Sequence, residues 1–213
     1  MRAFPSVRRR HGTPRGLRLA LHEILFDVVH GTDTSIELPD PTTPLGSASR
    51  SGHEASNPLV FMELIRRVPV VPQESVFLDL GAGKGRALLL AGRHGFRRAI
   101  GVEISPALCR IAGRNVHRAL RRHPGTAIEV HCADAGGFDI PDAVEVVYLY
   151  NPFPPPTLSR VIERITASQR RAPRRLFVVY AHSRHHDLLL EAGFVVLHRQ
   201  DGAGMVLIRY PPV

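Results

Sequence analysis

Lysine and cysteine are scarce in this sequence. Lys84 is the only lysine, so arginine supplies nearly all of the positive charge behind the formal net charge of +9. The two cysteines, Cys109 and Cys132, are distant in the sequence and form no Cys-x-x-Cys pair, which argues against a disulfide framework or a zinc site. Because disulfides are typical of oxidising compartments, we predict a cytoplasmic protein.

A long apolar run is also missing. No stretch approaches the ~18 consecutive apolar residues of a membrane-spanning helix, so we expect no membrane partner. Residues 14–29 have helical periodicity but include Arg18, Glu23 and Asp27, which indicates an amphipathic helix rather than a secretory signal. A transit peptide in the basic N-terminus stays open as an alternative.

Basic stretches that alternate with aromatic residues are absent too. The arginine clusters fall between the predicted elements and lack the interleaved aromatic side chains of a groove that stacks nucleobases. Abundant arginine together with abundant alanine, glycine and proline is more typical of a coding bias. Nucleic acid is therefore the less favoured partner, and acidic partners in general stay open.

From residue 58 onward, strand and helix patterns alternate. Short apolar runs predict strands at 76–80, 97–104, 126–134, 143–150, 174–181, 194–199 and 204–210. Helical patterns predict helices that begin at Asn57-Pro58 and that cover 84–95, 105–122, 155–171 and 184–193. The alternation predicts an α/β, Rossmann-like sheet of seven strands, mostly parallel with a C-terminal antiparallel hairpin and with helices on both faces.

The first 57 residues differ in composition from the rest of the chain. Residues 30–57 are polar and rich in Gly, Pro, Ser and Thr, which predicts a long loop of the kind that serves as a lid or a binding loop. We therefore divide the chain into an N-terminal helix with a lid-like extension at 1–57 and a globular domain at 58–213.

The segment VFLDLGAGKGR at 76–86 joins a buried strand to a glycine-rich turn. We expect Gly81 to permit a sharp turn, Gly83 to permit the close approach of a ligand, and Gly85 to let the next helix pack close to the sheet. Lys84 either contacts a carboxylate of the ligand or is a solvated lysine in the first helical turn. The spacing G-x-G-x-G differs from the G-x-G-x-x-G of dinucleotide-binding proteins, which disfavours an oxidoreductase.

Acids end the next two predicted strands. Glu103 follows the glycine turn at roughly the 20-residue offset of an acid that binds ribose hydroxyls. Asp134 lies in CADAGGF, where a carboxylate can accept a hydrogen bond from an adenine amino group. An ordinary strand-end acid at the first position and a turn-forming aspartate at the second are the structural alternatives.

Four segments together resemble a known family. VFLDLGAGKGR, GVEIS, CADAGGF and VVYLYNPF are similar, in order and in spacing, to the first four motifs of class I S-adenosylmethionine-dependent methyltransferases. The resemblance covers about 58–213, including the final hairpin, and FDVVHGTDTS resembles the leader of bacterial members with a GAGKGR motif. It implies the seven-stranded methyltransferase sheet, S-adenosyl-L-methionine as the cofactor and methyl transfer as the activity.

The resemblance also implies a set of site residues. By position in the motifs, the residues of the methionine pocket would be Asp79, Gly81, Ala82, Gly83, Lys84 and Gly85. The ribose and adenine would lie against Glu103, Ile104, Asp134 and Ala135. The transfer site would be formed by Asn151, Pro152 and Phe153, and Asn151 would face both the cofactor and the methyl acceptor.

The NPF segment at 151–153 resembles the Asn-Pro-Pro-aromatic tetrapeptide of enzymes that methylate planar nitrogens of bases or of glutamine. Phe153 comes one residue earlier than the aromatic residue of that motif, and three prolines follow it. A proline-rich helix start is therefore an equally good interpretation of this segment.

Other polar residues are candidates for contact with the acceptor: Asp33, Thr34, Tyr150 and His182. His182, His185 and His186 have a spacing that could hold a metal ion, but a surface or general-base role is favoured, and we predict no metal. Asp33 and Thr34 would contact the acceptor if the loop closes, and otherwise form an N-terminal turn.

The sequence therefore predicts transfer of a methyl group to a nitrogen on a protein side chain or a small molecule. The alternative is a catalytically silent module that binds the cofactor and docks RNA or an acidic partner through its basic surface.

Overall fold

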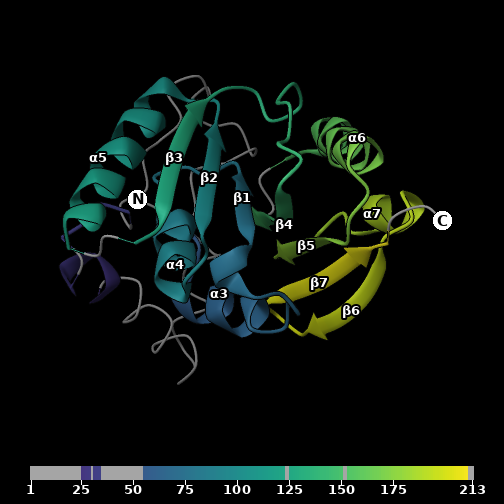
Figure 1. Cartoon of the computed structure of the whole chain (residues 1–213), viewed down its shortest axis with the longest axis horizontal. Helices are drawn as coiled ribbons and strands as arrows, with labels where there is room; N and C mark the ends of the chain where they lie inside the picture. Colours follow the sequence, from purple (N-terminus) through teal and green to yellow (C-terminus); the bar gives the residue numbers. More distant parts are fainter. Residues whose placement is uncertain (1–24, 30, 35–54, 123–124, 151–152, 211–213) are drawn as a thin grey trace, which may run out of the picture.

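The computed structural model describes residues 25–29, 31–34, 55–122, 125–150 and 153–210 (Figure 1). They form one seven-stranded sheet in the order β3-β2-β1-β4-β5-β7-β6. The strands are β1 (Val76–Leu80), β2 (Arg98–Glu103), β3 (Ala127–Cys132), β4 (Val144–Tyr150), β5 (Leu176–Ala181), β6 (Val195–Gln200) and β7 (Gly204–Arg209). Among these strands β7 runs antiparallel to both of its neighbours, β5 and β6, and the other pairs are parallel, so the predicted mixed sheet with a terminal hairpin is confirmed.

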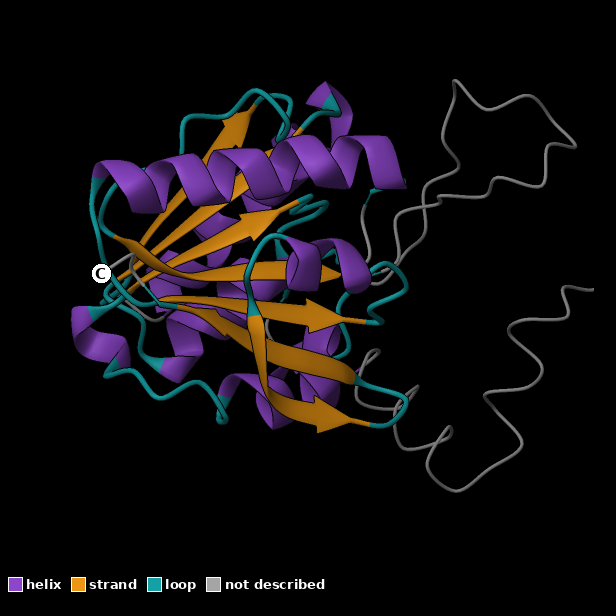
Figure 2. Cartoon of the chain, turned by 90° about the vertical axis from the view of Figure 1, so that its right-hand side faces the viewer, coloured by secondary structure: helices purple, strands orange, loops and turns teal. Residues whose placement is uncertain are grey.

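Helices cover both faces of this sheet (Figure 2). They are α3 (Pro58–Ile65), α4 (Arg86–His94), α5 (Pro106–Arg122), α6 (Pro155–Arg171) and α7 (Asp187–Glu191), with a short 3-10 helix, η1 (Pro72–Glu74). Asn57 caps α3, as its side chain accepts a hydrogen bond from the Leu59 N–H at 3.0 Å and Pro58 occupies the first turn. No described helix has the length and apolar character needed to span a membrane.

Alternate residues of each central strand enter two separate cores. Phe77 of β1 packs with α3 and α4 on one face, whereas Leu78 and Leu80 pack with α6 and α7 on the other. All five residues of β1 are buried, as expected for a parallel strand that helices cover on both sides. Because the parallel strands end at the same edge, the loops that follow β1, β2, β3, β4 and β5 gather there.

Gly101, in the middle of β2, allows a close approach of a helix to the sheet. A Cβ at this position would lie 2.6 Å from Cδ1 of Leu88 in α4 and 3.0 Å from the Cβ of Ala82. The absence of a side chain at Gly101 therefore sets how near α4 and the preceding loop lie to β2.

The described part of the N-terminal extension packs on the same face as α3 and α4. Residues 25–29 are helical, and Phe26 is buried in the core that contains Phe61 and Phe77. The predicted boundary after residue 57 stays a prediction, and most of the predicted loop, at 35–54, lies outside the described residues.

We predict opposite effects of alanine at two glycines. Gly101→Ala should lower the free energy of unfolding by roughly 1–3 kcal/mol, because the new methyl group overlaps Leu88 and Ala82 in a packed core. Gly113→Ala should raise it by about 0.5–1 kcal/mol, because Gly113 lies on the exposed side of α5 with open space around it. Urea denaturation of both variants measures the difference, and equal effects would contradict the proposed packing constraint.

Candidate active site

The glycine-rich turn connects β1 to α4 at the carboxyl edge of the sheet. Gly81, Gly83 and Gly85 have φ angles of 86°, 54° and 84°, in the left-handed region that residues with a Cβ rarely adopt. The N–H groups of Gly81 and Ala82 donate to the carbonyl oxygen of Val102 at 2.9 and 3.0 Å. The turn is therefore fastened to β2, and the glycines are required by its backbone conformation.

The predicted packing role of Gly85 needs correction. A Cβ at Gly85 would lie 3.3 Å from the Cβ of Ala112, so this glycine allows the start of α4 to approach α5 rather than the sheet. The close contact between helix and sheet is made at Gly101 instead.

The carboxylate of Glu103 joins the end of β2 to the glycine turn. It is 8% exposed, and it accepts hydrogen bonds from the Gly83 N–H at 2.8 Å and from the Ser105 N–H at 2.9 Å. The two predicted cofactor residues Gly83 and Glu103 therefore lie in direct contact. Each oxygen of a carboxylate accepts more than one hydrogen bond, so these contacts leave acceptor capacity for the hydroxyl groups of a ligand.

Asp79 precedes Gly83 by four residues and lies on the same face of the sheet as Glu103. It is 3% exposed, and burial, with a smaller contribution from the negative charge of Glu103, raises the pKa of Asp79 from 3.8 to about 8. At neutral pH the free protein therefore holds this carboxyl mostly protonated. A cationic ligand group beside it would favour the ionised form.

The residues predicted to contact adenine follow β2 and β3. Ile104 is 68% exposed, which is unusual for a large apolar side chain next to a buried acid, whereas Ala135 is buried. Asp134 accepts from the Gly136 N–H at 3.0 Å and pairs with Arg160 at 3.3 Å. The turn-forming role considered for Asp134 is thus present, and its contact with adenine stays a prediction.

The ends of β4 and β5 bring two candidate acceptor residues together. The rings of Tyr150 and His182 lie edge to face with their centroids 5.0 Å apart. His182 has a φ of 48°, and its N–H donates to the carbonyl oxygen of Ala203 at 2.9 Å. Strained backbone of this kind is often found at functional sites. Phe153 is partly buried against the α6 core, and Asn151 and Pro152 lie outside the described residues.

Lys84 is not the solvated lysine that was considered as one alternative, and its contact with a ligand carboxylate stays a prediction. Its side chain is 1% exposed, and Nζ lies 3.0 Å from Oδ1 of Asp33, which is 45% exposed. Thr34 is fully buried, and its hydroxyl oxygen accepts from Nε of Arg86 at 2.7 Å, so contact with an acceptor does not match its position. The sequence analysis did not single out Arg86, although a charged residue at the start of a mostly apolar helix could have indicated a buried contact.

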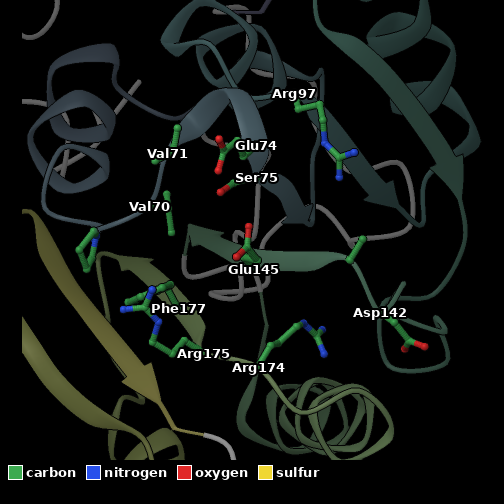
Figure 3. Close-up of a pocket in the computed structure, with 12 residues that line it drawn as sticks. Val70, Val71, Glu74, Ser75, Arg97, Asp142, Glu145, Arg174, Arg175 and Phe177 are labelled. Atoms are coloured by element: carbon green, nitrogen blue, oxygen red, sulfur yellow. The ribbon is translucent and has the colours of Figure 1, made fainter.

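A groove of about 670 Å³ lies at the opposite, amino edge of the sheet (Figure 3). Its lining includes Val71, Glu74, Arg97, Glu145 and Arg175, from the segments that precede or begin β1, β2, β4 and β5. Because α/β sheets bind ligands beyond the carboxyl ends of their strands, we do not assign the reaction to this groove. Within the described residues, no group of three His, Cys, Asp or Glu side chains could hold a metal ion.

Comparison with known families identifies the central part of the chain. The family model described as "Methyltransferase domain" matches residues 77–171. Residues 77–171 are thus similar to a methyltransferase domain. The match includes the glycine turn, Glu103 and Asp134, and it supports the predicted class of activity and the predicted cofactor, S-adenosylmethionine. No curated protein matches the sequence of the chain.

Solved structures of methyltransferases share the fold at low sequence identity. A protein assigned as an S-adenosylmethionine-dependent methyltransferase from Methanococcus maripaludis is 12% identical, with a TM-score of 0.56 over 73% of this chain and 85% of that chain. Magnesium protoporphyrin IX methyltransferase from Synechocystis PCC 6803 is 15% identical, with a TM-score of 0.51 over 98% of this chain and 85% of that chain.

A ribosomal protein L11 methylase from Lactobacillus delbrueckii subsp. bulgaricus is 16% identical, with a TM-score of 0.51 over 72% of this chain and 78% of that chain. These likenesses confirm the Rossmann-like methyltransferase fold. Together with the family match they support assignment to the class I S-adenosylmethionine-dependent methyltransferases, whereas membership of the GAGKGR subgroup stays a prediction.

We predict that Asp79→Asn stabilises the protein increasingly as the pH rises. The pKa of Asp79 is raised in the folded protein, so its contribution to stability is fully present below pH 3.8 and is lost as the pH rises through about 8. Asparagine stays neutral, so the free energy of unfolding of the variant should exceed that of the wild type by up to ~6 kcal/mol near pH 9, at roughly 1.4 kcal/mol per pKa unit. Thermal unfolding between pH 5 and pH 9 gives the difference.

Asp201→Asn, on the exposed turn between β6 and β7, is the matched control and should change stability little at any of these pH values. A constant difference between Asp79→Asn and the wild type across this range would show that Asp79 is not a buried, protonated acid.

Proposed function

We propose that this protein transfers a methyl group from S-adenosylmethionine to a nitrogen atom on a protein side chain or a small molecule. The observation that carries the proposal is the contact between the Glu103 carboxylate and the Gly83 N–H, beside the buried Asp79. A glycine-rich turn and two acids at neighbouring strand ends then face the same ligand.

Each of these residues has a separate task in our proposal. The turn Gly81–Gly85 receives the methionine part of the cofactor, and Asp79 ionises as it meets the ammonium group. Glu103 accepts hydrogen bonds from the ribose hydroxyls, and the exposed Ile104 packs against the adenine ring. Ala135 and Asp134 close the adenine side of the pocket.

The bound cofactor would supply a methyl group that is already electrophilic, because it is attached to a sulfonium. The protein then needs mainly to align the acceptor in line with the breaking bond and to exclude water. Such alignment can lower the barrier by roughly 7–11 kcal/mol. We assign His182 to accept the proton that the acceptor nitrogen loses, and Tyr150 to hold the imidazole ring through their edge-to-face contact.

The acceptor would enter where β4 and β5 end. On the strength of the NPF motif, we propose that Asn151 and Pro152, which lie outside the described residues, contact the acceptor nitrogen. Of the proteins with a similar fold, one is named as a methylase of a ribosomal protein and another as a methyltransferase of a porphyrin. The same architecture therefore accommodates protein acceptors and small-molecule acceptors. We propose that residues 58–213 act as the catalytic domain of a cytoplasmic enzyme, with 1–57 as its extension.

We expect S-adenosylhomocysteine to bind the wild-type protein and Glu103→Gln to weaken that binding by at least about tenfold, since a hydrogen bond to a charged acceptor is lost. Isothermal titration calorimetry measures both affinities. Glu129→Gln, which removes an exposed partner of Arg98 on the neighbouring strand, is the matched control and should bind like the wild type. Absence of binding by the wild type would refute the proposed function.

For the acceptor, incubation of lysate fractions with a methyl-labelled donor should place label in protein or in small molecules. With that acceptor, His182→Asn should lower kcat by about 10²-fold, as loss of a general base does, and leave the affinity for S-adenosylhomocysteine unchanged. Label found only in RNA would exclude the proposed acceptor classes. An equal loss of affinity in His182→Asn would place His182 in the cofactor pocket instead.

A further inference from the structure

Both basic side chains of the GAGKGR turn are buried and face the N-terminal extension rather than solvent. Lys84 is 1% exposed and Arg86 is 2% exposed. Nζ of Lys84 lies 3.0 Å from Oδ1 of Asp33, so the turn is joined by an ion pair to a residue 51 positions earlier in the chain. Figure 1 shows this N-terminal segment, in purple, beside α5.

Arg86 makes a second set of contacts with the same segment. Its Nε donates to the Thr34 hydroxyl oxygen at 2.7 Å, and its Nη2 lies 3.4 Å from Oδ2 of Asp27. Asp27 in turn accepts from the hydroxyl groups of Thr32 and Thr34 at 2.7 and 2.6 Å. The guanidinium also lies over the ring of Phe26, with its carbon 5.4 Å from the ring centroid.

Asn115 of α5 connects the two segments through their backbones. Its Oδ1 accepts from the Asp33 N–H at 3.1 Å, and its Nδ2 donates to the carbonyl oxygens of Asp33 and Lys84, both at 3.0 Å. Asn115 is 1% exposed. The side chain thus meets Asp33 and Lys84 at once, and their relative position is set by one buried amide.

We infer that residues 27–29 and 31–34 hold the glycine turn in the conformation that binds the cofactor, and that Asp33 and Asp27 are positioning residues for that binding. The inference rests on the proposed function, since it concerns the same site. The turn is fastened on one side to β2, through Val102 and Glu103, and on the other side to the N-terminal segment.

The energetics support this role. Three left-handed glycines within five residues make the free turn flexible, so its ligand-binding shape needs external contacts. A buried ammonium or guanidinium without a partner is strongly unfavourable, so loss of Asp33 or Asp27 would drive Lys84 or Arg86 toward solvent and displace the turn. The cofactor would then have to pay the cost of reordering the turn, which lowers its affinity.

Asp33→Asn tests the inference with little risk to folding, because the change is isosteric and the Asp33 carboxylate is 45% exposed. By calorimetry, S-adenosylhomocysteine should bind Asp33→Asn about five- to thirtyfold more weakly than the wild type, as expected for loss of a hydrogen bond between charged groups. Asp33→Glu, which keeps the charge, should recover most of the affinity.

A double-mutant cycle shows whether the effect acts through Lys84. In a Lys84→Met background, Asp33→Asn should cause no further loss of affinity, because its partner is already absent. Losses that simply multiply in the double variant would overturn the assignment. Asp142→Asn, which breaks an exposed pair with Arg171 on the other face of the sheet, is the control and should bind the ligand like the wild type.

Hydrogen–deuterium exchange of the ligand-free protein separates this inference from the proposed function. Asp33→Asn should speed exchange in the peptide that covers 81–89, whereas the peptide that covers 144–150 should be unchanged. Wild-type protein that does not bind S-adenosylhomocysteine would refute the function, and the exchange would still decide whether Asp33 and its neighbours hold the turn. Unchanged exchange together with unchanged affinity in Asp33→Asn would overturn the inference, whatever happens to thermal stability.

Discussion

Two carboxyl groups, those of Asp79 and Glu103, are buried near each other where β1 and β2 end, and no structure can easily keep both ionised. Burial and the charge of Glu103 raise the pKa of Asp79 to about 8. Glu103 keeps hydrogen bonds from two backbone N–H groups, at Gly83 and Ser105. The site is therefore electrostatically incomplete, and a ligand that carries a positive charge next to Asp79 and hydroxyl groups next to Glu103 would complete it.

The glycine turn connects these two acids to the rest of the molecule. Val102 fixes its start, Glu103 fixes its centre, and Lys84 and Arg86 link it to a segment more than fifty residues away. Two of these anchors come from β2 and two extend to the N-terminal segment. A short loop with little conformational preference of its own is thereby held from both sides, which is what precise positioning of a flexible cofactor requires.

Sequence patterns were sufficient for the sheet because its central strands, β1, β4 and β5, are apolar on both faces, and glycine and proline separate the elements. Boundaries shifted where a turn competes with a strand: β3 ends at Cys132 rather than at 134, since Asp134 forms a turn with Gly136. The proximity of Gly83 and Glu103 followed from two parallel strands that end at one edge. The environment of Lys84 did not, because Asp33 and Asn115 reach it across 51 and 31 positions, and such contacts leave no local pattern.

The burial of Lys84 and Arg86 also bears on how the protein should be prepared for study. The family match begins at residue 77, and composition alone would place the start of the domain at 58. A shortened chain that begins at either point would lose Asp27 and Asp33 and leave an ammonium and a guanidinium inside the fold with their acidic partners removed. Recombinant versions meant for crystallisation or assay should therefore retain the polypeptide from before residue 25, although standard boundary rules would discard it.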